Sequence, residues 1–440
     1  MNIILLSGGS GKRLWPLSNN VRSKQFIKIF RNEDQIYESM IQRMYNKICK
    51  IDKKSKITIA TSKTQVSAIH NQLDENVGIS IEPCRKDTFP AIVLATSYLH
   101  DIEKVGEDEA VVVCPVDPYV KDDYFNMLEK LGNLAERNEA NLILMGIKPT
   151  YPSEKYGYII PSSDEEISSV LTFKEKPNQK MAKEYLKQNA LWNGGVFAYK
   201  LKYVLDIAHQ LIEFTDYYDL YSKYGDLEKI SFDYAVVEKE KSIKVVKFDG
   251  EWKDLGTWNT LTEAMDEAII GKATLSDDCD NVHVINELDI PVLCMGLKNI
   301  VVSASPDGIL VSDKEKSSYI KHYLDNLSDK VMYAEKSWGN FRVLDVQDDS
   351  MTIKITLNKN HQMNYHMHEK RDETWTIISG KGLAIIDDEK IPMLPGDIIK
   401  MPAGCKHTIV ALTELKLIEV QSGYDISVED KIKCKSKFKI

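Results

Sequence analysis

A glycine-rich, basic segment follows the first apolar stretch of the chain and reads Leu6-Ser-Gly-Gly-Ser-Gly-Lys-Arg-Leu-Trp-Pro-Leu-Ser18. Gly8, Gly9 and Gly11 allow the backbone to approach a ligand closely, and successive N–H groups there can form an anion-binding nest. Arg13 adds a bidentate phosphate donor, and Lys24 adds a mobile point charge. Fixed cations of this kind stabilise the charge that gathers on phosphate oxygens during attack at phosphorus. The segment therefore predicts a phosphate-binding loop.

Two aspartates, Asp117 and Asp254, could share one Mg2+ although they lie far apart in the sequence. Hard cations favour carboxylate oxygens and substrate phosphates. An ion shared with both substrates would orient an in-line attack by a substrate oxygen, so no protein nucleophile is needed. Lys24 and Lys176 would neutralise phosphate charge. Taken singly, each aspartate is equally well explained as a strand-end cap or a turn residue, and it is the glycine loop that favours the metal.

A second cluster of residues that could bind a ligand or take part in a reaction lies near the C-terminus. Four of the nine histidines fall there, between 361 and 407. His366 and His368 are two apart, which places both on one face of a strand. Glu373 and His407 can complete the set from neighbouring strands. Imidazole nitrogens with one carboxylate suit a divalent transition metal such as Zn, Co, Mn, Ni or Fe. The glycine and proline spacing around these residues is close to that of the two cupin motifs.

The elements that must position these residues follow two different patterns. Residues 1–265 alternate short apolar runs, such as 2–6, 56–60 and 110–114, with amphipathic stretches, such as 35–47 and 91–105. This alternation predicts an α/β domain with a mostly parallel sheet, whose ligands bind at the carboxyl ends of the strands. Residues 266–332 contain short β-rich pieces and predict a small β connector. Residues 333–440 contain evenly spaced short strands, which predict a closed β-barrel or sandwich.

Bulk properties exclude some classes of function. A net charge of -9 argues against general nucleic-acid binding, and no apolar run is long enough to span a membrane. The start of the chain is typical of a first strand and not of a signal peptide. Seven scattered cysteines without a CxxC pair indicate reduced thiols. A cytoplasmic location is therefore expected.

Taken together, the motifs resemble the sugar-1-phosphate nucleotidylyltransferases. The closer resemblance is to bacterial mannose-1-phosphate guanylyltransferases of the long type, which carry a fused type II phosphomannose isomerase domain. The family loop reads GGSGTRLWPLS followed by PKQF, so Lys12 and Ser23 depart from it, whereas Trp15 favours the mannose and guanylyl branch. The resemblance implies a Rossmann-like, GT-A-like mixed sheet, then the connector, then a C-terminal cupin β-barrel.

The resemblance also implies roles for individual residues, carried by segments in the family's order: 82–91, 114–118, 156–158, 173–177, 192–197, 233–239 and 252–258. The catalytic residues would be Arg13, Lys24, Asp117 and Asp254, with Mg2+ on the two aspartates. The nucleotide, GTP, would contact Leu6, Gly8, Gly9, Ser10, Gly11, Lys12, Arg13, Glu82, Arg85, Asp87 and Thr88. The hexose 1-phosphate would contact Tyr156, Gly157, Glu175, Lys176, Asn193 and Gly194. A homodimer is expected only by analogy.

The C-terminal segment resembles the isomerase domain but departs from it at the metal motif. The family's Q-x-HHHRAEHW reads His366-Met-His-Glu-Lys-Arg-Asp-Glu-Thr-Trp375 in this chain, so the metal set His366, His368, Glu373 and His407 survives. Aldose–ketose isomerisation needs a base that moves a proton between C1 and C2. Lys370 and Arg371 could bind the sugar phosphate, but no residue stands out as the base. The sequence leaves a mannose-6-phosphate isomerase activity open.

Two alternatives to the guanylyltransferase hypothesis are compatible with the sequence. Lys12, Ser23 and Pro118, which stands where the family has His, motivate an enzyme of the same fold that uses another sugar 1-phosphate, or CTP or UTP. The second alternative is a non-catalytic sugar-nucleotide sensor whose metal-binding barrel docks partners. Retention of the full phosphate and metal set argues against a sensor.

Overall fold

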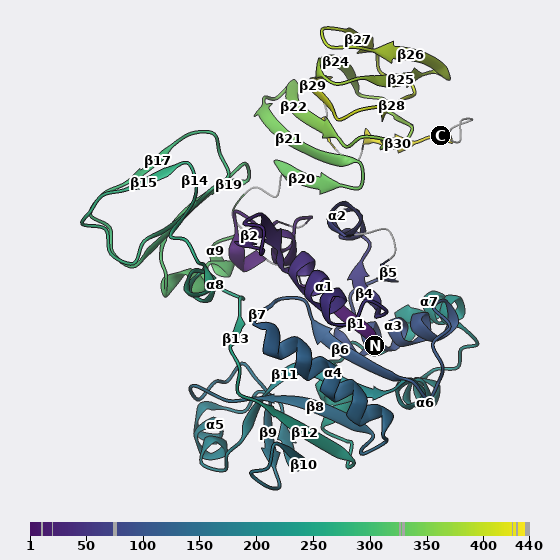
Figure 1. Ribbon diagram of the computed structural model, residues 1–440. Coiled ribbons are helices and arrows are strands. Elements are labelled where there is room, and N and C mark those ends of the chain that lie inside the picture. The colour runs from purple at the N-terminus through teal and green to yellow at the C-terminus, as the bar shows by residue number, and fades with distance from the viewer. Residues whose placement is uncertain are drawn as a thin grey trace. The chain divides into compact units, whose positions relative to one another are not determined.

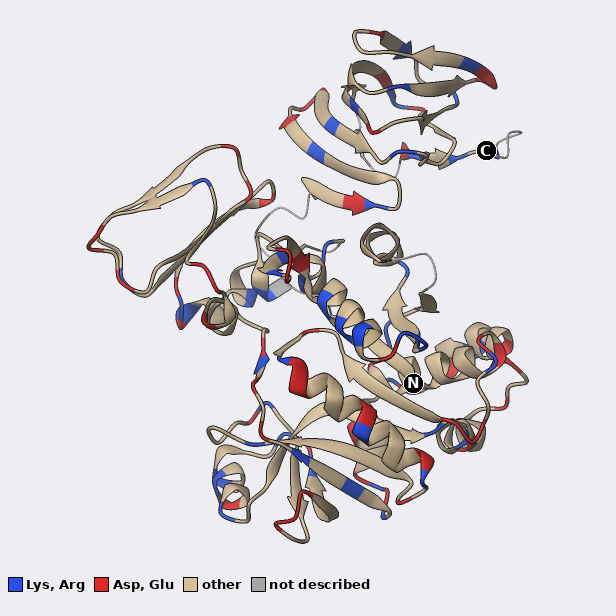
Figure 2. Cartoon of the chain, in the orientation of Figure 1, with Lys and Arg blue, Asp and Glu red and all other residues tan. Residues whose placement is uncertain are grey.

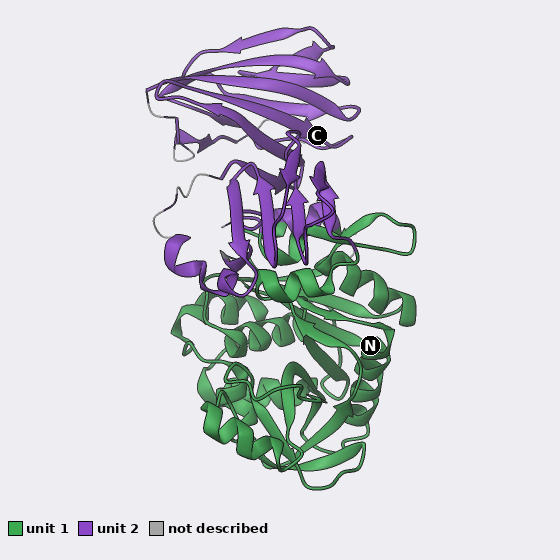
Figure 3. Cartoon of the chain, turned by 90° about the vertical axis from the view of Figure 1, so that its left-hand side faces the viewer, with its two compact units in different colours: residues 1–11, 23–66, 73–266 green, residues 12–22, 67–72, 267–440 purple. Residues whose placement is uncertain are grey.

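The computed structural model describes residues 1–9, 12–19, 21–73, 77–324, 327, 331–424, 426–427 and 430–435. Two compact units divide the chain (Figure 3). The first contains residues 1–11, 23–66 and 73–266, and the second contains residues 12–22, 67–72 and 267–440. The boundary therefore runs through the glycine-rich segment, with Gly8 and Gly9 in the first unit and Arg13 in the second.

A nine-stranded mixed sheet forms the first unit (Figure 1). In spatial order its strands are β5 (Gly78–Glu82), β4 (Lys56–Ser62), β1 (Asn2–Ser7), β6 (Ala110–Pro115), β11 (Leu191–Lys200), β8 (Leu142–Ile147), β12 (Ile243–Phe248), β10 (Ile167–Lys174) and β9 (Tyr158–Pro161). The strands β5, β4, β1 and β6 run parallel, as do β8 and β12, while β11 is antiparallel to its neighbours β6 and β8. Every residue of β8 is buried, as expected for a strand covered on both faces.

Helices cover this sheet in two groups. The helix α3 (Thr88–Asp101) packs on β1, β4 and β5 with α6 (Leu201–Leu211) and α7 (Tyr217–Lys223) against it. The helix α4 (Asp122–Glu136) packs on β6, β11, β8 and β12, with α1 (Met40–Ile51) against it. Figure 2 shows basic residues along α1 and acidic residues at the start of α4, where Lys47 and Asp122 form an ion pair of 2.9 Å. Smaller elements are α5 (Gln179–Leu186), α8 (Trp258–Ala264), a 3-10 turn (Lys24–Phe26), a π-helical turn (Asp233–Val237) and two ribbons, β2 (Lys28–Arg31) with β3 (Tyr37–Ser39) and β7 (Pro118–Val120) with β13 (Trp252–Asp254).

The start of α1 differs from the expectation of a helix over residues 35–47. Tyr37–Ser39 instead pairs with β2, and Ser39 caps the helix through a reciprocal hydrogen-bond pair with Gln42. The start of α1 is therefore set by the strand pairing of Tyr37–Ser39 and by the Ser39 cap. The helical periodicity of the sequence before residue 40 does not determine it.

The second unit contains the connector and the C-terminal β domain. The connector has a four-stranded sheet of β14 (Ile269–Gly271), β16 (His283–Asn286), β18 (Ile300–Ser305) and β19 (Gly308–Asp313), and a ribbon of β15 (Ala273–Leu275) and β17 (Val292–Cys294). Two short turns follow, a 3-10 turn (Lys316–Tyr319) and α9 (Lys321–Leu324), and α2 (Val66–Gln72) falls almost entirely in this unit.

Two sheets enclose one core in the C-terminal β domain, which confirms the cupin-like barrel. The first contains β20 (Tyr333–Lys336), β21 (Gly339–Val346), β22 (Ser350–Leu357), β29 (Leu415–Gly423), β24 (Arg371–Ser379) and β27 (Ile398–Met401). The second contains β26 (Glu389–Met393), β25 (Gly382–Ile386), β28 (His407–Ala411), β23 (His366–Met367) and β30 (Ile432–Lys433). Trp375, Ile377 and Leu417 of one sheet share a core with Ala384 and Ile409 of the other. No helix within the described ranges is long and apolar enough to cross a membrane.

Candidate functional sites

Lys24 and the two aspartates expected to bind Mg2+ lie together in the first unit. Lys24 Nζ is 2.6 Å from Asp117 Oδ2 and 3.7 Å from Asp254 Oδ1. The reason is topological: Asp117 directly precedes β7, and residue 118 pairs with Asp254 across the β7–β13 ribbon. Both carboxylates are more than a third exposed, whereas the lysine is 11% exposed. The cluster therefore offers oxygen donors and a cation at the carboxyl end of β6, the edge where such sheets bind ligands.

Buried glutamines support the glycine turn from below. Gln65 and Gln25 are 0% and 1% exposed. Gln65 donates through Nε2 to the Gly9 carbonyl and to Ser23 Oγ, and its Oε1 accepts from Thr61 Oγ1 at 2.9 Å. Gln25 donates to Ser7 Oγ at 3.1 Å. Ser23, which stands where the family has proline, is thus part of the framework beneath the loop.

The other residues expected in the glycine-rich loop have fewer described contacts. Leu6 is the half-buried residue next to the end of β1, and Gly8 faces Glu82, whose Oε1 would lie 3.8 Å from a Cβ at Gly8. Ser10 and Gly11 lie outside the described residues. Lys12 and Arg13 begin a short 3-10 turn in the second unit, where Arg13 is exposed.

The expected nucleotide segment surrounds the start of α3. Glu82 ends β5, and its Oε2 accepts a hydrogen bond of 2.8 Å from Tyr224. Burial raises the pKa of Glu82 above its usual range. Asp87 has a positive φ of 75° and caps α3 by accepting from Thr88 N, while Arg85 is exposed. The carboxylate of Glu82 is thus held by Tyr224, whereas Arg85 faces solvent.

The residues expected to bind the sugar phosphate converge at the ends of β9, β10 and β11. The Gly157 carbonyl accepts from Asn193 N at 2.8 Å, and a Cβ on Gly157 would lie 2.5 Å from Glu175 Oε2. Lys176 Nζ is 2.6 Å from Glu175 Oε1. A Cβ on Gly194 would lie 2.5 Å from Ile147, so a residue with a side chain fits at position 194 only if Ile147 moves.

Asp233 fixes the side chain of Asn193, a role that the sequence did not reveal. Asn193 Nδ2 donates to Asp233 Oδ1 at 2.6 Å, and Asn193 Oδ1 accepts from Gly195 N at 3.1 Å. Both ends of the carboxamide are therefore held. Burial, and then the charge of Glu175, raise the pKa of Asp233 to about 7.

Aromatic rings join this sugar cluster to the aspartate pair. The Tyr156 ring lies 4.8 Å from that of Trp192 and 5.5 Å from that of Trp252. Trp252 is two residues before Asp254 on β13, so both side chains lie on one face of the ribbon. Burial, and then the nearby charge of Asp254, raise the pKa of Tyr156. The expected sugar residues and the aspartates are therefore joined by one run of neighbouring aromatic side chains in the first unit.

The expected metal ligands of the barrel meet in its interior. The four residues are buried, and one ligand atom from each lies within 4.8 Å of all the others. The set consists of His366 on β23, His368 just after it, Glu373 on β24 and His407 on β28.

Hydrogen bonds prepare the three imidazoles to bind a cation. Their Nδ1 atoms lie 2.6, 3.1 and 3.0 Å from the backbone carbonyls of Asn364, Asp430 and Cys405. A carbonyl only accepts, so Nδ1 carries the proton and each Nε2 keeps its lone pair. Burial lowers the pKa of His366 to about 3, which keeps that ring neutral, as a metal ligand must be.

The expected metal-ligand atoms lie so close together that a cation between them would be stabilising. His368 Nε2 is 3.0 Å from Glu373 Oε1, and His407 Nε2 is 3.1 Å from Glu373 Oε2. His407 Nε2 is buried without a hydrogen-bond partner among the described residues. Acceptor atoms packed this closely fit a shared divalent cation.

Glu419 and Gln421 on β29 support this centre and were not singled out from the sequence. Gln421 Nε2 donates to Glu373 Oε1 at 3.2 Å and to Glu419 Oε1 at 2.5 Å. Trp375 Nε1 donates to Glu419 Oε2 at 3.0 Å. Burial, and then the charge of Glu373, raise the pKa of Glu419 to about 7. The alternation Leu417-x-Glu419-x-Gln421 on a buried strand face was the available signal.

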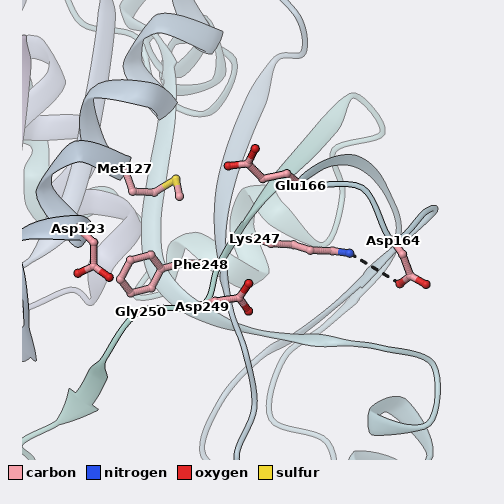
Figure 4. A pocket seen from close by; sticks show the side chains of 8 residues that line it. All are labelled: Asp123, Met127, Asp164, Glu166, Lys247, Phe248, Asp249 and Gly250. Atoms are coloured by element: carbon pink, nitrogen blue, oxygen red, sulfur yellow. Dashed lines mark ion pairs between the residues drawn. The ribbon is translucent and has the colours of Figure 1, made fainter.

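A separate hollow of about 630 Å³ opens in the first unit beside α4 (Figure 4). Its lining includes four carboxylates and one lysine, whose ammonium is 3.7 Å from Asp164. None of the residues expected at the site lines it. Its lining residues are Asp123, Met127, Asp164, Glu166, Lys247, Phe248, Asp249 and Gly250. Because the acidic groups would repel phosphate, the hollow is not a nucleotide site.

Comparison with known proteins identifies two parts of the chain. The family model described as nucleotidyl transferase matches residues 2–269, and the model described as mannose-6-phosphate isomerase C-terminal matches residues 325–436. The alginate biosynthesis protein AlgA of Pseudomonas aeruginosa is 28% identical over 97% of this chain and 95% of its own. Mannose-1-phosphate guanylyltransferase 2 of Escherichia coli O157:H7 is 26% identical over 99% of this chain and 98% of its own.

A solved structure supports the same fold. The crystal structure described as mannose-1-phosphate geranyltransferase from Thermus thermophilus covers 74% of this chain and 98% of its own, with a TM-score of 0.63 and 24% identity. This similarity confirms the expected nucleotidyltransferase fold.

Proposed function

Because the chain belongs to the nucleotidyl transferase family and carries a mannose-6-phosphate isomerase C-terminal domain, we propose that it transfers the guanylyl group of GTP to mannose 1-phosphate. The products are GDP-mannose and pyrophosphate. One observation carries the proposal: Lys24 lies between the paired carboxylates of Asp117 and Asp254. A phosphate-neutralising cation beside two hard oxygen donors supports a site at which a nucleotide and a sugar phosphate react. The name of the Escherichia coli relative, mannose-1-phosphate guanylyltransferase 2, supplies the choice of sugar and nucleotide.

Asp117 and Asp254 fit a Mg2+ site by their chemistry and exposure. Both present oxygen donors, and both stay accessible to substrate oxygens that would complete the coordination. The ion would supply charge neutralisation for the phosphates. Lys24 holds the α-phosphate, and Arg13 donates to the leaving phosphates. The mannose 1-phosphate oxygen then attacks in line.

The sugar cluster orients mannose 1-phosphate for this attack. Glu175, which follows β10, and Asn193, near the start of β11, are buried polar groups, and they bind the hydroxyl groups of the sugar. Lys176 binds its phosphate. Since Asp233 and Gly195 hold the Asn193 carboxamide at both ends, this part of the site is rigid before the sugar binds.

A second activity, the interconversion of mannose 6-phosphate and fructose 6-phosphate, is proposed for the barrel. The observation that favours it is the set of three Nε2 lone pairs and one carboxylate around a common point. A divalent transition metal held there would polarise the substrate oxygens. The chain's own contribution is to fix the three imidazoles through their Nδ1 hydrogen bonds.

Pyrophosphate release with each of the four NTPs and a panel of sugar 1-phosphates tests the transferase proposal. We expect turnover with GTP and mannose 1-phosphate. Turnover only with CTP or UTP, or with another sugar, would show a transferase of different specificity. Absence of turnover with every pair would favour the sensor.

A further inference from the structure

Residues 12–22 carry the expected cation Arg13 near one end and lead directly to Lys24 at the other. By its contacts this segment belongs to the second unit, together with the connector and the barrel. Its 3-10 turn ends at Leu14, and the next one begins at Lys24. Among the described residues between these two turns there is no helix or strand. Side-chain contacts must therefore hold the backbone that joins the two cations.

The side chain of Asn19 uses its whole hydrogen-bonding capacity on this backbone and its surroundings. Its Oδ1 accepts from the backbone N–H groups of Val21 and Arg22 at 2.8 and 2.6 Å. Its Nδ2 donates to Asp307 Oδ2 at 2.7 Å and to the Tyr333 carbonyl at 3.2 Å. A carboxamide offers two acceptor and two donor positions, and all four are used. One side chain thus shapes the local backbone and attaches it to the connector and to the start of β20.

Arg22 makes a second attachment to the connector. Its Nη1 and Nη2 donate to the two carboxylate oxygens of Glu287 at 2.8 and 2.9 Å, which is the bidentate arrangement. The guanidinium also lies 5.2 Å from the Tyr333 ring centroid, and Arg22 is buried. The net stability from a buried ion pair is small, because the cost of desolvation offsets the attraction. Two parallel hydrogen bonds nevertheless fix the geometry, which favours a role in positioning the backbone.

Glu287 and Asp307 lie at the same end of the connector sheet. The strands β16 and β18 run parallel, so the chain leaves both strands at that end. Glu287 directly follows β16, and its N–H donates to the Ala304 carbonyl of β18 at 2.8 Å. Asp307 lies between β18 and β19, and its Oδ1 accepts from Met332 N at 2.7 Å. Both carboxylates are therefore held by the connector, and Asp307 also binds the residue that precedes the barrel strand β20.

From this arrangement we propose that Glu287 and Asp307 are positioning residues for nucleotidyl transfer. They hold Arg22 and Asn19, and the short backbone connections on either side carry this constraint to Lys24 and to Arg13. Loss of either carboxylate frees that backbone, so the two cations meet the phosphates in the productive arrangement less often. The inference rests on the transferase part of the proposed function, in which both cations act on the phosphates.

Pyrophosphate release from GTP and mannose 1-phosphate by the full chain tests this role with Asp307→Asn and Glu287→Gln. Both substitutions keep the side-chain shape, remove the charge and turn one acceptor oxygen into an amide donor. Asp313→Asn is the matched control, because Asp313 is a connector carboxylate that likewise accepts from an asparagine, Asn299, and from backbone N–H groups.

We expect kcat to fall at least about tenfold in Asp307→Asn and in Glu287→Gln, and to stay within about twofold of wild type in Asp313→Asn. The KM for mannose 1-phosphate should change less than about twofold in all three, because the residues expected to bind the sugar lie in the first unit. The double variant should lose little more kcat than the weaker of the two single variants, since both carboxylates hold the same backbone.

Hydrogen–deuterium exchange measures the backbone itself and does not depend on turnover. A peptide that covers residues 14–22 should exchange faster in Asp307→Asn and in Glu287→Gln, because the N–H groups of Val21 and Arg22 lose their fixed acceptor. The same peptide should exchange as in wild type in Asp313→Asn.

Other outcomes overturn the inference. Wild-type kcat in both variants contradicts it, and so does an equal loss in Asp313→Asn, which would show a general connector defect. A lower kcat with unchanged exchange contradicts it as well, because the carboxylates would then act without holding the backbone. A wild-type chain that releases no pyrophosphate refutes the proposed function and the inference together, whereas an active wild type with fully active variants refutes the positioning role alone.

Discussion

The Trp15 indole lies directly against Gly308 of the connector: a Cβ atom built on Gly308 would come within 2.5 Å of Trp15 Cζ2. Gly308 also has a φ of 150°, a conformation that other residues rarely adopt. Nearby, Ser305 Oγ donates to the Pro16 carbonyl at 2.7 Å. The connector therefore holds the segment that continues the glycine-rich loop, and Arg13 lies two residues before Trp15.

Gly308→Ala should displace Trp15 and, through the chain, Arg13. We expect kcat/KM for pyrophosphate release to fall about tenfold, because misplacing a charge-stabilising group by a fraction of an ångström weakens its effect. Gly296→Ala is the control, since Gly296 also has a positive φ in the connector and its Cβ would approach only Asp278. Equal losses in the two variants would show a general connector defect and contradict a role for the Trp15 contact.

Gln65→Leu should weaken the support beneath the glycine turn. The substitution leaves the Ser23 hydroxyl and the Gly9 carbonyl without this partner, at a cost of about 2–4 kcal/mol, while the Thr61 hydroxyl keeps the Ser7 carbonyl as its acceptor. Chemical unfolding of the first unit measures this loss, and the KM for GTP should rise with it. Unchanged stability together with an unchanged KM would contradict the proposed support.

Asp233 should make the first unit less stable as the pH rises. Its folded pKa of about 7 is above the value of an exposed aspartate, so the folded state binds the proton more tightly than the unfolded state. That stabilisation is present at low pH and is lost as the pH rises towards 7. Relative to Asp233→Asn, the wild type should lose about 3 kcal/mol between pH 5 and pH 8. Parallel melting curves across this range would refute the raised pKa.

Metal removal should destabilise the barrel through its buried histidines. A ligand present at about 100 times its Kd stabilises the folded state by about 3 kcal/mol. We expect chelation to lower the melting temperature of the wild type, and His366→Ala to abolish Zn or Co binding. His361→Ala is the matched control, because His361 is a neighbouring exposed histidine outside the set. Equal metal binding by the two variants would contradict the ligand assignment.

Local sequence patterns were sufficient for most of the fold. The apolar run 110–114 predicted β6, and the evenly spaced short strands of residues 333–440 predicted the β domain that contains β24 and β29. The two-residue spacing of His366 and His368 placed both in the barrel interior. These features depend on near neighbours along the chain.

Relationships between distant segments could not be read in this way. Lys24, Asp117 and Asp254 meet only because the β7–β13 ribbon pairs residues more than 130 positions apart. Gln65 is an ordinary polar residue in sequence, and only the fold places it beneath Gly9.

Pyrophosphate release from GTP and mannose 1-phosphate by Asp254→Asn is the most direct test of nucleotidyl transfer at Lys24, Asp117 and Asp254. Asp249→Asn serves as the control, because Asp249 is an exposed aspartate nearby in sequence and lines the separate acidic hollow. We predict a rate at least about 100-fold below wild type for Asp254→Asn, and a rate within threefold of wild type for Asp249→Asn. A near wild-type rate for Asp254→Asn would contradict the account.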